Sequence, residues 1–546
     1  MTDFSIIEVV RAVALSAPDR EALVHSHGRL TYRELLARAD ALAGVLHQSG
    51  LGAHRPRPGL ENWESGQDHL ALYLHNCPEY LEGMLGAYAA RVAPFNVNYR
   101  YVAEELRHLL ADSGARAILY HSTFAPILDA VRSDLPALTV LLQVADDSGN
   151  ALLPGAEWFD DAMAASPGAA PVEPSPDDLY ILYTGGTTGL PKGVLWRQGD
   201  IYPAALGGRR ISTGEEYPSI DAVAANAAKG SMRVLPSAPF MHGAAHWMAL
   251  NAFHNGNTVV LPDDPTSFDP ADFLDTIARE HINIALIVGD AFGRPVLDEL
   301  SLRSRDLSSL SLLISGGAAL SAPVKAALLE RLPTIAIMDG LGSSESGQQA
   351  SQVTTADRPV STGTFTPGTG MTILSEDLTR RLEAGDAEQG WLAQHGRVPL
   401  GYLGDAEKTA RTFPTINGVR YSVPGDRARL TAEGLLELHG RDSVTINSGG
   451  EKIFAEEVEA ALAHHPAIQD VIVTGRPSQR WGQEVVAIVQ FRPDASATHD
   501  ELLEACAAHI ARYKFPKETI VVEKVLRSPA GKADYRWAKQ LATGDV

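Results

Sequence analysis

Short apolar segments alternate with helical patterns along most of the chain, and this alternation limits the folds that it can adopt. Segments 70–75, 117–120, 284–288 and 310–315 are apolar runs typical of buried strands. Segment 104–110 has the apolar spacing of a helix. Parallel strands need a crossover connection, which is usually a helix. We therefore predict an α/β fold with mostly parallel sheets and flanking helices.

With 546 residues the chain is too long for a single hydrophobic core. The pattern of apolar and polar residues changes near residue 440. Beyond it, helical patterns over 455–463 and 501–511 enclose strand patterns over 471–474 and 484–491. This indicates a small α+β domain, so we predict a large domain over residues 1–440 and a small one over 441–546.

Local signals predict a few further features of the chain. Thr31 followed by Glu34 predicts a capped helix start. The polar segments 54–67 and 145–178 contain Pro and Gly and predict surface connections.

Charge and cysteine content exclude several classes of function. A formal net charge of -21 argues against non-specific nucleic-acid binding, which needs a basic surface. No apolar run has the length of a membrane span, so we expect no integral membrane segment. The two cysteines cannot form a disulfide framework, and a cytoplasmic location is the simplest expectation. A polyphosphate ligand would need locally concentrated donors, because the overall field repels it.

The strongest local motif runs from Tyr183 to Gly193. It reads Tyr183-Thr184-Gly185-Gly186-Thr187-Thr188-Gly189-Leu190-Pro191-Lys192-Gly193. Glycines allow a tight turn that points backbone N–H groups inward, threonines add hydroxyl donors, and the lysine adds a compact positive charge. The segment therefore predicts a phosphate-binding loop, and the Gly-Lys-Ser/Thr ending of a Walker A motif is absent.

This segment resembles the phosphate loop of the adenylate-forming enzymes, which include acyl-CoA synthetases, peptide-synthetase adenylation domains and firefly luciferase. Further motifs of the family follow in order along the chain, and the match is most like actinobacterial fatty-acid and steroid-side-chain CoA synthetases. The resemblance implies a large N-terminal domain and a mobile C-terminal domain. It also implies that the chain uses ATP, Mg²⁺ and coenzyme A.

The resemblance assigns most of an ATP site to residues of this chain. Glu345 would hold Mg²⁺ together with Thr184, Asp426 would bind the ribose hydroxyls, and Arg441 would contact the ribose. Leu341 stands where the family usually has Tyr, which removes ring stacking on adenine. Gly316, Gly317 and Ala318 resemble the family's adenine-binding turn. The remaining predicted ATP residues are Gly185, Gly186, Thr187, Thr188, Gly189, Lys192, Asp339, Gly340, Gly342, Ser343 and Ser344. Gly401-Tyr402 and the following Glu407-Lys408-Thr409 also match family segments, which we interpret as structural.

The small domain carries the family's remaining functional segments. Lys532, in Pro529-Ala530-Gly531-Lys532, would stabilise charge on the acid carboxylate and the α-phosphate during adenylation. Asp442 and Ser443 stand at the hinge, and either residue can be its pivot. Gly449, Gly450, Glu451 and Lys452 would line the coenzyme A path. The alternative for Lys532 is a solvated lysine near the chain end.

The acyl pocket is assigned by position in the family. Its predicted residues are Phe240, Met241, Ala244, Trp247, Gly289, Asp290 and Phe292. His242 would gate or line the carboxylate site, and a core or capping histidine is the alternative. Asp290 is the only candidate to bind an α-amino group, so an apolar or bulky acid is favoured.

We therefore predict an ATP-dependent acid–CoA ligase that forms an acyl-adenylate and then a thioester, with AMP and pyrophosphate as products. The small-molecule partners are a carboxylic acid, ATP and CoA, and a homodimer is left open. One alternative is an enzyme that loads a carrier protein. Another is a nucleotide-binding regulator without catalysis, which the charged residues at every expected position argue against. Nothing in the sequence specifically supports luciferase-type oxygenation.

Overall fold

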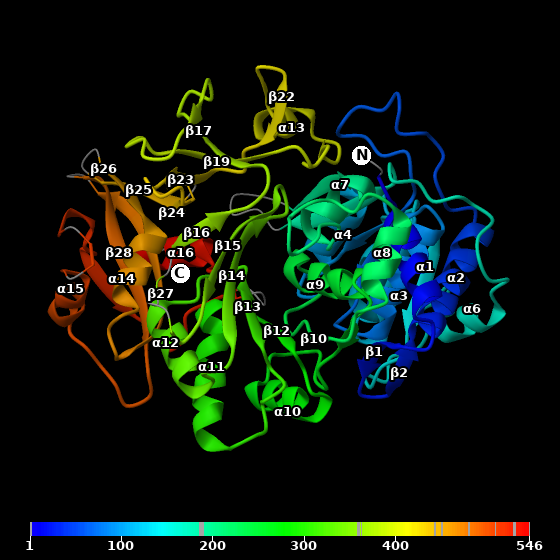
Figure 1. Ribbon diagram of the computed structural model, residues 1–546, viewed down its shortest axis with the longest axis horizontal. Coiled ribbons are helices and arrows are strands. Elements are labelled where there is room, and N and C mark those ends of the chain that lie inside the picture. The colour runs from blue at the N-terminus through cyan, green and yellow to red at the C-terminus, as the bar shows by residue number, and fades with distance from the viewer. Residues whose placement is uncertain are drawn as a thin grey trace.

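The computed structural model divides into several sheets covered by helices (Figure 1). It describes residues 3–184, 191–357, 361, 363–441, 444–448, 451–478, 481–507, 509–510, 512–527 and 531–544. The C-terminal part, drawn in orange and red, lies at one end of the molecule, and the blue N-terminal elements lie at the other end. No helix in these ranges is long and apolar enough to cross a membrane.

The first sheet is wholly parallel and has the strand order β4-β3-β5-β6-β7. Every residue of β3 and β5 is buried, which explains their uninterrupted apolar sequence. The strands are β3 (His69–Tyr73), β4 (Ala93–Asn96), β5 (Ala117–His121), β6 (Val140–Val144) and β7 (Glu157–Trp158). The helices along this stretch are α3 (Pro78–Ala89), α4 (Ala103–Asp112), α5 (Ala125–Arg132) and α6 (Phe159–Ala165). Segment 145–178 is therefore not only a connection, because it contains β7 and α6.

The largest sheet changes character at β14. Strands β1, β11, β10, β12, β13 and β14 are parallel, and those from β15 onward pair antiparallel. A turn at Ser344 to Ser346 joins β14 to β15, and so short a turn can only produce an antiparallel pair. The strands are β1 (Glu21–His25), β2 (Gly28–Thr31), β10 (Arg233–Leu235), β11 (Thr258–Val260), β12 (Ile284–Ile287), β13 (Leu312–Gly316), β14 (Ala336–Ser343), β15 (Gly347–Thr354), β16 (Thr364–Pro367), β17 (Met371–Leu374), β18 (Arg381–Leu382), β19 (Gly390–His395), β21 (Thr415–Ile416), β22 (Val419–Ser422), β23 (Asp426–Leu430) and β24 (Leu436–Arg441).

Helices pack around these strands. The predicted capped start of α2 is confirmed: Thr31 Oγ1 accepts from Glu34 N at 3.3 Å, and the Glu34 carboxylate accepts from Thr31 N at 2.8 Å. The helices are α1 (Ile6–Ser16), α2 (Tyr32–Gln48), α7 (Gln198–Ala205), α8 (Ile220–Ala227), α9 (Gly243–His254), α10 (Pro270–Glu280), α11 (Gly289–Leu302), α12 (Ala322–Arg331) and α13 (Ala406–Thr412).

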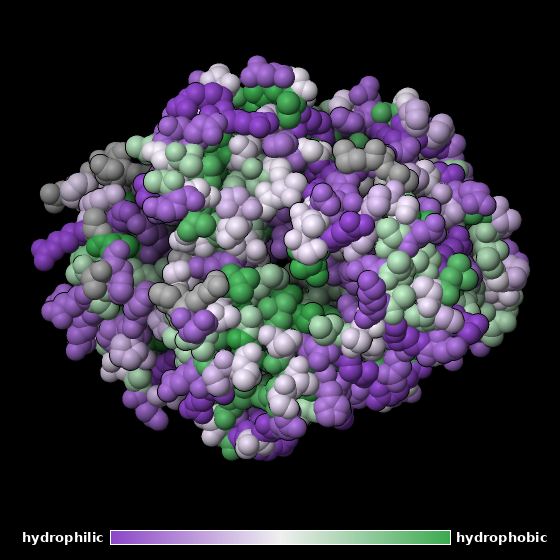
Figure 2. Space-filling model, in the orientation of Figure 1, coloured by the Kyte–Doolittle hydropathy of each residue, from purple (hydrophilic) through white to green (hydrophobic). Residues whose placement is uncertain are grey.

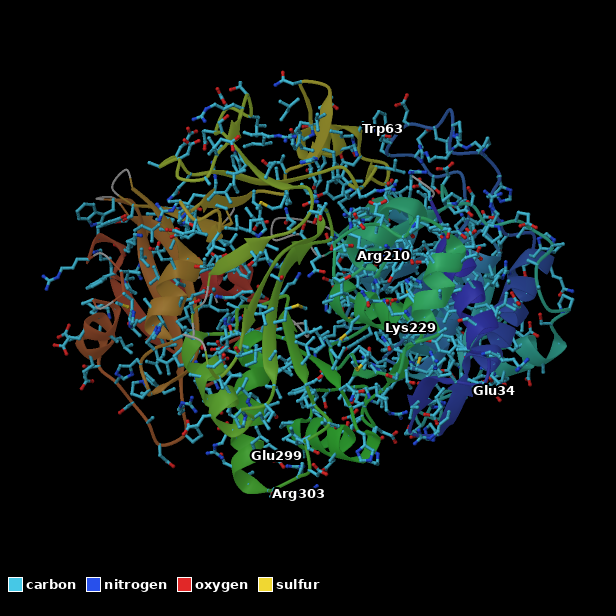
Figure 3. The ribbon with its side chains drawn as sticks, viewed as in Figure 1. Glu34, Trp63, Arg210, Lys229, Glu299 and Arg303 are labelled. Carbon is cyan, nitrogen blue, oxygen red and sulfur yellow. The ribbon has the colours of Figure 1, made fainter. Side chains whose placement is uncertain are left out.

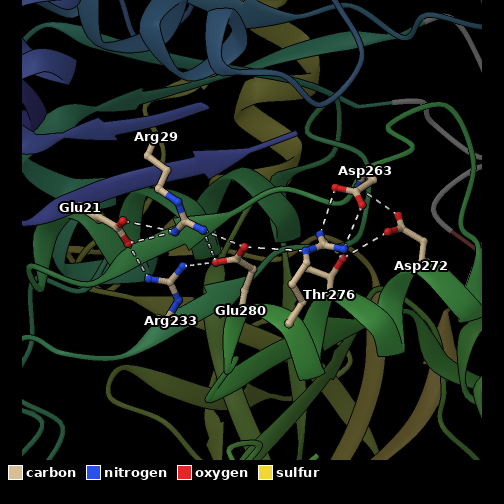
Figure 4. A network of polar contacts seen from close by, with 8 residues as sticks. Glu21, Arg29, Arg233, Asp263, Asp272, Thr276 and Glu280 are labelled. Atoms are coloured by element: carbon tan, nitrogen blue, oxygen red, sulfur yellow. Dashed lines mark hydrogen bonds and ion pairs between the residues drawn. The ribbon is translucent and has the colours of Figure 1, made fainter. Parts of the chain in front are cut away.

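A charged network joins the N-terminal hairpin β1–β2 to the large sheet (Figure 4). Arg233 of β10 contacts Glu21 at 2.7 Å and Glu280 of α10 at 2.5 Å, and Arg29 of β2 contacts Glu280 at 2.9 Å. Charges that share partners in this way stabilise more than isolated surface pairs do. In Figure 2 the rim of the visible face is mainly hydrophilic, and apolar residues gather nearer its centre.

A third sheet has three strands in the order β20-β9-β8 and joins residues that are distant in sequence. Its strands are β8 (Leu179–Thr184), β9 (Lys192–Arg197) and β20 (Gly401–Tyr402). The irregular loop 54–67 reaches this region, where Trp63 O accepts from Gly404 N at 2.8 Å. Figure 3 shows Trp63 near α13. The predicted surface loop thus fastens the β20–α13 turn.

The C-terminal residues form their own sheet, β26-β25-β28-β27, with β29 beside β28. Its strands are β25 (Thr445–Ser448), β26 (Glu451–Phe454), β27 (Ile468–Ser478), β28 (Gly482–Phe491) and β29 (Glu518–Val521), and its helices are α14 (Ala455–Leu462), α15 (His499–Ala507) and α16 (Tyr535–Thr543). The large sheet ends at Arg441 and this sheet begins at Thr445. The α/β fold with a small α+β unit is thus confirmed, and the division at 440 stays a prediction.

Candidate active site

The base of the predicted phosphate loop is a strand pair. Thr184, at the end of β8, lies opposite Lys192, the first residue of β9. Asn96 of β4 fixes this base, since its Nδ2 donates to Tyr183 O at 2.8 Å and its Oδ1 accepts from Tyr183 N at 2.8 Å. The same Nδ2 donates to Met241 O at 2.7 Å, which ties the loop base to the segment before α9. The predicted residues Gly185, Gly186, Thr187, Thr188 and Gly189 lie outside the described residues.

Lys192 lies among acidic side chains. Its Nζ is 3.4 Å from Asp112 Oδ1 and 3.9 Å from Asp405 Oδ2. Tyr183 Oη donates to the other oxygen of Asp112 at 2.9 Å. Two carboxylates therefore hold the ammonium beside the loop base, where a polyphosphate would compete for it.

Glu345 stands on the turn between β14 and β15, and three strands converge on this turn. Tyr402 of β20 donates its hydroxyl to Glu345 Oε1 at 2.8 Å. Ser422 of β22 donates to Glu345 O at 2.6 Å, and Trp196 Nε1 of β9 donates to Ser344 O at 2.9 Å. Because Tyr402 and Trp196 belong to the sheet that carries Lys192, the turn and the phosphate-loop base lie next to each other.

A lysine that sequence reasoning missed also lies near Glu345. Lys408 Nζ stands 4.1 Å from the centre of the Tyr402 ring. Burial lowers the pKa of Lys408, while the charge of Glu345 opposes that shift. The sequence places Lys408 in a segment interpreted as structural, so only its spatial neighbours reveal it.

The predicted adenine turn follows β13 and pairs with β14. Gly316 lies opposite Gly340 in the parallel register, and Gly317 has a φ of 82°. Leu341 packs beside an apolar cluster of the antiparallel strands. A Cβ on Gly316 or Gly340 would meet only one carbonyl oxygen, at 3.9 Å or 3.8 Å. The two glycines therefore leave open backbone on which a flat base can lie.

Asp339 has a partner that the sequence did not suggest. Its Oδ2 accepts from Lys325 Nζ of α12 at 2.6 Å, and the Lys325 side chain is 0% exposed. Burial raises the pKa of Asp339, and Lys325 opposes that shift. Any role of Asp339 toward ATP would therefore involve its backbone, or a side chain that is already in an ion pair.

The backbones of Asp426 and Arg441 lie opposite each other on two paired strands. Asp426 begins β23 and Arg441 ends β24, and they are direct partners in the antiparallel register. These strands continue through β16 and β15 to β14, which carries Gly340 and leads into Glu345. The predicted ribose residues are thus on the same sheet as the predicted adenine and metal residues.

His242 precedes α9 and is neutral. Burial and, next, the nearby ammonium of Lys532 lower its pKa to about 3. Its Nε2 is buried and has no hydrogen-bond partner within the described part of the chain. Within the described part of the chain, His242 Nε2 is therefore available for a hydrogen bond to a ligand.

The predicted acyl-pocket residues fall into two groups. Phe240 and Met241 are fully buried in the cores, whereas Ala244 and Trp247 are partly buried on α9. Trp247 Nε1 donates to Tyr180 Oη at 2.6 Å, and that hydroxyl in turn contacts His246 Nε2.

The second wall is formed by α11. Phe292 stacks on Phe268 with ring centres 3.8 Å apart. Gly289, at a φ of 52°, lets the helix approach Ala318 and Ala319 beside the predicted adenine turn. Asp290 accepts from Ser321 N at 2.7 Å, Ser321 Oγ at 2.8 Å and Arg294 Nη2 at 2.9 Å. Its carboxylate is thus engaged by three donors, which removes the argument for amino-group binding.

Lys532 reaches the large domain from the small one. A Cβ on the preceding Gly531 would lie 2.8 Å from Val288 Cγ1 and 3.3 Å from Ala291 Cβ, so this loop packs directly on the start of α11. Lys532 itself is exposed, and its charge acts on His242. Asp442, Ser443, Gly449 and Gly450 lie outside the described residues, and Glu451 and Lys452 are described only as backbone of β26.

Comparison with known proteins decides the family. The model of the AMP-binding enzyme family matches residues 10–403, and that of the AMP-binding enzyme C-terminal domain matches residues 457–532. The chain belongs to the AMP-binding enzyme family. This confirms the predicted membership of the adenylate-forming enzymes.

This AMP-binding enzyme has similar relatives over its whole length. It is 51% identical over 545 residues to the medium-chain acyl-CoA ligase Mig of Mycobacterium avium, covering 99% of this chain and 98% of the relative. It is 40% identical to a medium/long-chain-fatty-acid–CoA/3-oxocholest-4-en-26-oate–CoA ligase of Mycobacterium tuberculosis, covering 96% and 94%. Its fold matches the anthranilate CoA ligase AuaEII in complex with anthranoyl-AMP, with a TM-score of 0.81, 21% identity and coverage of 100% and 98%.

Proposed function

We propose that this enzyme is an ATP-dependent acid–CoA ligase acting on apolar carboxylic acids of medium or greater length. The near-full-length identity of 51% to a medium-chain acyl-CoA ligase carries the proposal. The arrangement of Lys192, Glu345, Asp426 and Lys532 around one region supports it independently.

In the first half-reaction the acid carboxylate oxygen attacks the α-phosphorus of ATP, and the bond to the β-phosphate breaks to release pyrophosphate. Lys192 leaves Asp112 and Asp405 for the phosphates. Asp426 accepts from the ribose hydroxyls. Lys532 stabilises negative charge that accumulates between the carboxylate and the α-phosphate, and neutral His242 offers its buried Nε2 toward the carboxylate site.

The residues present fit a magnesium ion. Across the described ranges, no three His, Cys, Asp or Glu side chains are grouped as metal ligands. Mg²⁺ in nucleotide sites is usually held by one or two carboxylates together with substrate phosphates. Glu345, whose orientation Tyr402 fixes, would hold it with the Thr184 hydroxyl, and the ion would neutralise phosphate charge.

In the second half-reaction the thiol of coenzyme A attacks the acyl carbon. The bond from that carbon to the phosphate oxygen breaks, AMP leaves, and the thiol proton passes to solvent. We infer that the small domain rotates about 442–443 between the two steps, so that Lys532, whose loop packs on the start of α11, withdraws before the thiol attacks. Glu451 and Lys452 of β26 then stand beside the path of the pantetheine arm.

The acid is proposed from the pocket walls. Trp247 and Phe292 offer apolar surface, and the three donors on Asp290 leave it poorly placed to bind an ammonium group. The named relatives act on medium- and long-chain fatty acids and on a steroid side-chain acid. We therefore propose fatty acids of medium to long chain first and steroid side-chain acids second.

The test measures acid-dependent exchange of pyrophosphate into ATP across medium-chain, long-chain, aromatic, steroid and amino acids. Thioester formation is then measured with CoA and with a pantetheinylated carrier protein. We expect apolar acids and CoA to be preferred, and Lys532→Ala to lower exchange by roughly 10²–10³-fold. The exposed Lys539→Ala on α16 serves as the control. A preference for amino acids, or ATP binding without exchange, would overturn the proposal.

The cellular location and the oligomeric state of the enzyme are also proposals. Cys77 and Cys506 are both free and buried, which suits a reducing cytoplasm. A homodimer is proposed only as a state to be tested by light scattering during gel filtration. A single mass near that of one chain would exclude it.

A further inference from the structure

The loop that carries Lys532 is closed at its base. Arg527 and Ala533 form an isolated antiparallel bridge, and Asp534 N donates to Leu526 O at 3.3 Å. Lys532 therefore sits one residue inside the closing pair. A long side chain at such a place is aimed by the backbone on either side of it.

Arg527 ties this loop to the sheet of the small domain. Its Nε and Nη2 donate to the two oxygens of Asp470 on β27, each at 2.7 Å, and Nη2 also donates to Val471 O at 3.2 Å. Its Nη1 donates to Gly531 O at 3.1 Å. One planar group thus joins a rigid strand to the carbonyl just before Lys532.

We infer that Arg527 is a positioning residue for adenylation, holding the backbone at Gly531 so that Lys532 points into the active site. The inference deepens the proposed function and rests on it. The Arg527 guanidinium is engaged by Asp470, Val471 and Gly531, so Arg527 would act through Lys532 and not on the substrates directly.

The fork geometry explains why arginine stands here. Two donors grip the Asp470 carboxylate in parallel while a third reaches the loop, and a lysine ammonium cannot make these contacts in one plane. The side chains of Arg527 and Asp470 are only 21% and 22% exposed, so solvent weakens the pair less than it would weaken a surface pair.

A half-buried carboxylate lies on the other side of the cluster. Glu459 of α14 accepts from Val473 N at 2.8 Å and from Tyr535 Oη at 3.2 Å. Burial raises the pKa of Glu459 to about 8. Tyr535 begins α16 immediately after the Lys532 loop, so Glu459 fixes the exit of the loop as Arg527 fixes its entrance.

The test separates the two half-reactions. Arg527→Ala and Arg527→Lys are measured for acid-dependent pyrophosphate exchange and for thioester formation from purified acyl-adenylate and CoA. We expect Arg527→Ala to lower exchange by about 10–100-fold, since a displacement near 1 Å of a reacting group can cost about 10²-fold. Thioester formation should stay within about twofold, because Lys532 has withdrawn by then. The exchange rate of Arg527→Lys should lie between those of Arg527→Ala and the parent enzyme.

A matched control removes another arginine from the same sheet. Arg476 of β27 pairs with Glu484 at 2.6 Å and also with Glu518, and its side chain is 28% exposed. We expect Arg476→Ala to leave the ratio of the two half-reactions unchanged. Thermal unfolding of each variant shows whether it is folded.

A double substitution shows whether Arg527 acts through Lys532. If it does, Arg527→Ala should add almost nothing to the loss already caused by Lys532→Ala. Additive losses, or an equal fall in both half-reactions by a folded variant, would overturn the inference. If Lys532→Ala itself leaves exchange unchanged, the proposed role of Lys532 fails instead, so the two failures are distinguishable.

Discussion

Replacing Gly531 by alanine would test whether Lys532 works from the arrangement seen here. Gly531 has a φ of 67°, and a Cβ there would lie 2.8 Å from Val288 Cγ1 and 3.3 Å from Ala291 Cβ. Both neighbours belong to the large domain, at the start of α11. The added methyl group would therefore push the small domain away from the position that brings Lys532 to the substrates.

Two terms contribute to the effect, and only one is specific to adenylation. Overpacking a close contact costs about 1–3 kcal/mol. Because about 1.4 kcal/mol corresponds to a factor of ten in rate, adenylation should slow by about 5–150-fold. The left-handed backbone adds about 1–2 kcal/mol for an L-residue wherever that backbone persists. That second term lowers stability but does not distinguish the half-reactions.

The assay compares pyrophosphate exchange with acyl transfer from purified adenylate to CoA. Gly544→Ala is a matched control, because Gly544 has a φ of 78° and a Cβ there would meet no atom of the described residues within 4 Å. This variant has the cost of a left-handed backbone but no close contact for the added Cβ, so its rate of pyrophosphate exchange should equal that of the parent enzyme. Val288→Ala removes the nearest atom and should restore most of the exchange lost by Gly531→Ala. Equal loss of both half-reactions, or no rescue, would refute the reasoning.

Three further outcomes are expected. Tyr180→Phe removes the acceptor of the Trp247 indole. A buried polar group left without a partner costs about 1–3 kcal/mol, so the KM for the acid should rise by about 5–150-fold while the KM for ATP stays constant. Tyr402→Phe removes the hydroxyl that donates to Glu345, and it should raise the Mg²⁺ concentration that half-saturates pyrophosphate exchange. An unchanged Mg²⁺ concentration would count against Glu345 as the metal residue. Burial lowers the pKa of His254 to about 4, so between pH 6.5 and 4 this imidazole binds a proton in the unfolded chain first. His254 alone should then lower stability to urea by about 1.4 kcal/mol per pH unit as pH drops, in addition to the effect of other buried histidines. His254→Gln should make this decline shallower, and an identical slope would contradict it.

Local sequence signals predicted the strands and helices whose pattern is uninterrupted. The apolar runs at β3 and β5 are strands because both faces of the parallel sheet are covered. By contrast, the short strand β7 and helix α6 within 145–178 were missed. A two-residue strand has no measurable period, and the surrounding Pro and Gly residues resemble a connection.

Pairings between distant residues account for most of what the sequence left open at the site. Asp290 looked available for an amino group, but Ser321 and Arg294 engage it, and no local pattern announces such partners. Asp339 similarly hides an ion pair with Lys325, which lies on a separate helix. Only the fold makes these donors neighbours, so a carboxylate in a motif predicts a charge and not its partner.

A contact between distant residues also revises our interpretation of Gly401-Tyr402 as structural. Its tyrosine donates to the predicted metal residue Glu345, 57 positions away in sequence. The segment therefore has a structural and a positioning role. Strand β20 completes the sheet that carries Lys192, and the Tyr402 side chain orients the carboxylate of Glu345 on the neighbouring turn. The likeness to the family correctly identified the segment, but the function of the tyrosine depends on two strands meeting.

The small domain presents its lysine next to a close backbone contact with the large domain. Gly531 has no side chain, which allows the loop to approach Val288 and Ala291 closely. Arg527 holds the same glycine from behind through its carbonyl oxygen. If the small domain leaves after the first half-reaction as proposed, a larger apolar contact at this point would slow its departure. Orientation then has to come from within the small domain, and the Asp470–Arg527 pair is where the structure provides it.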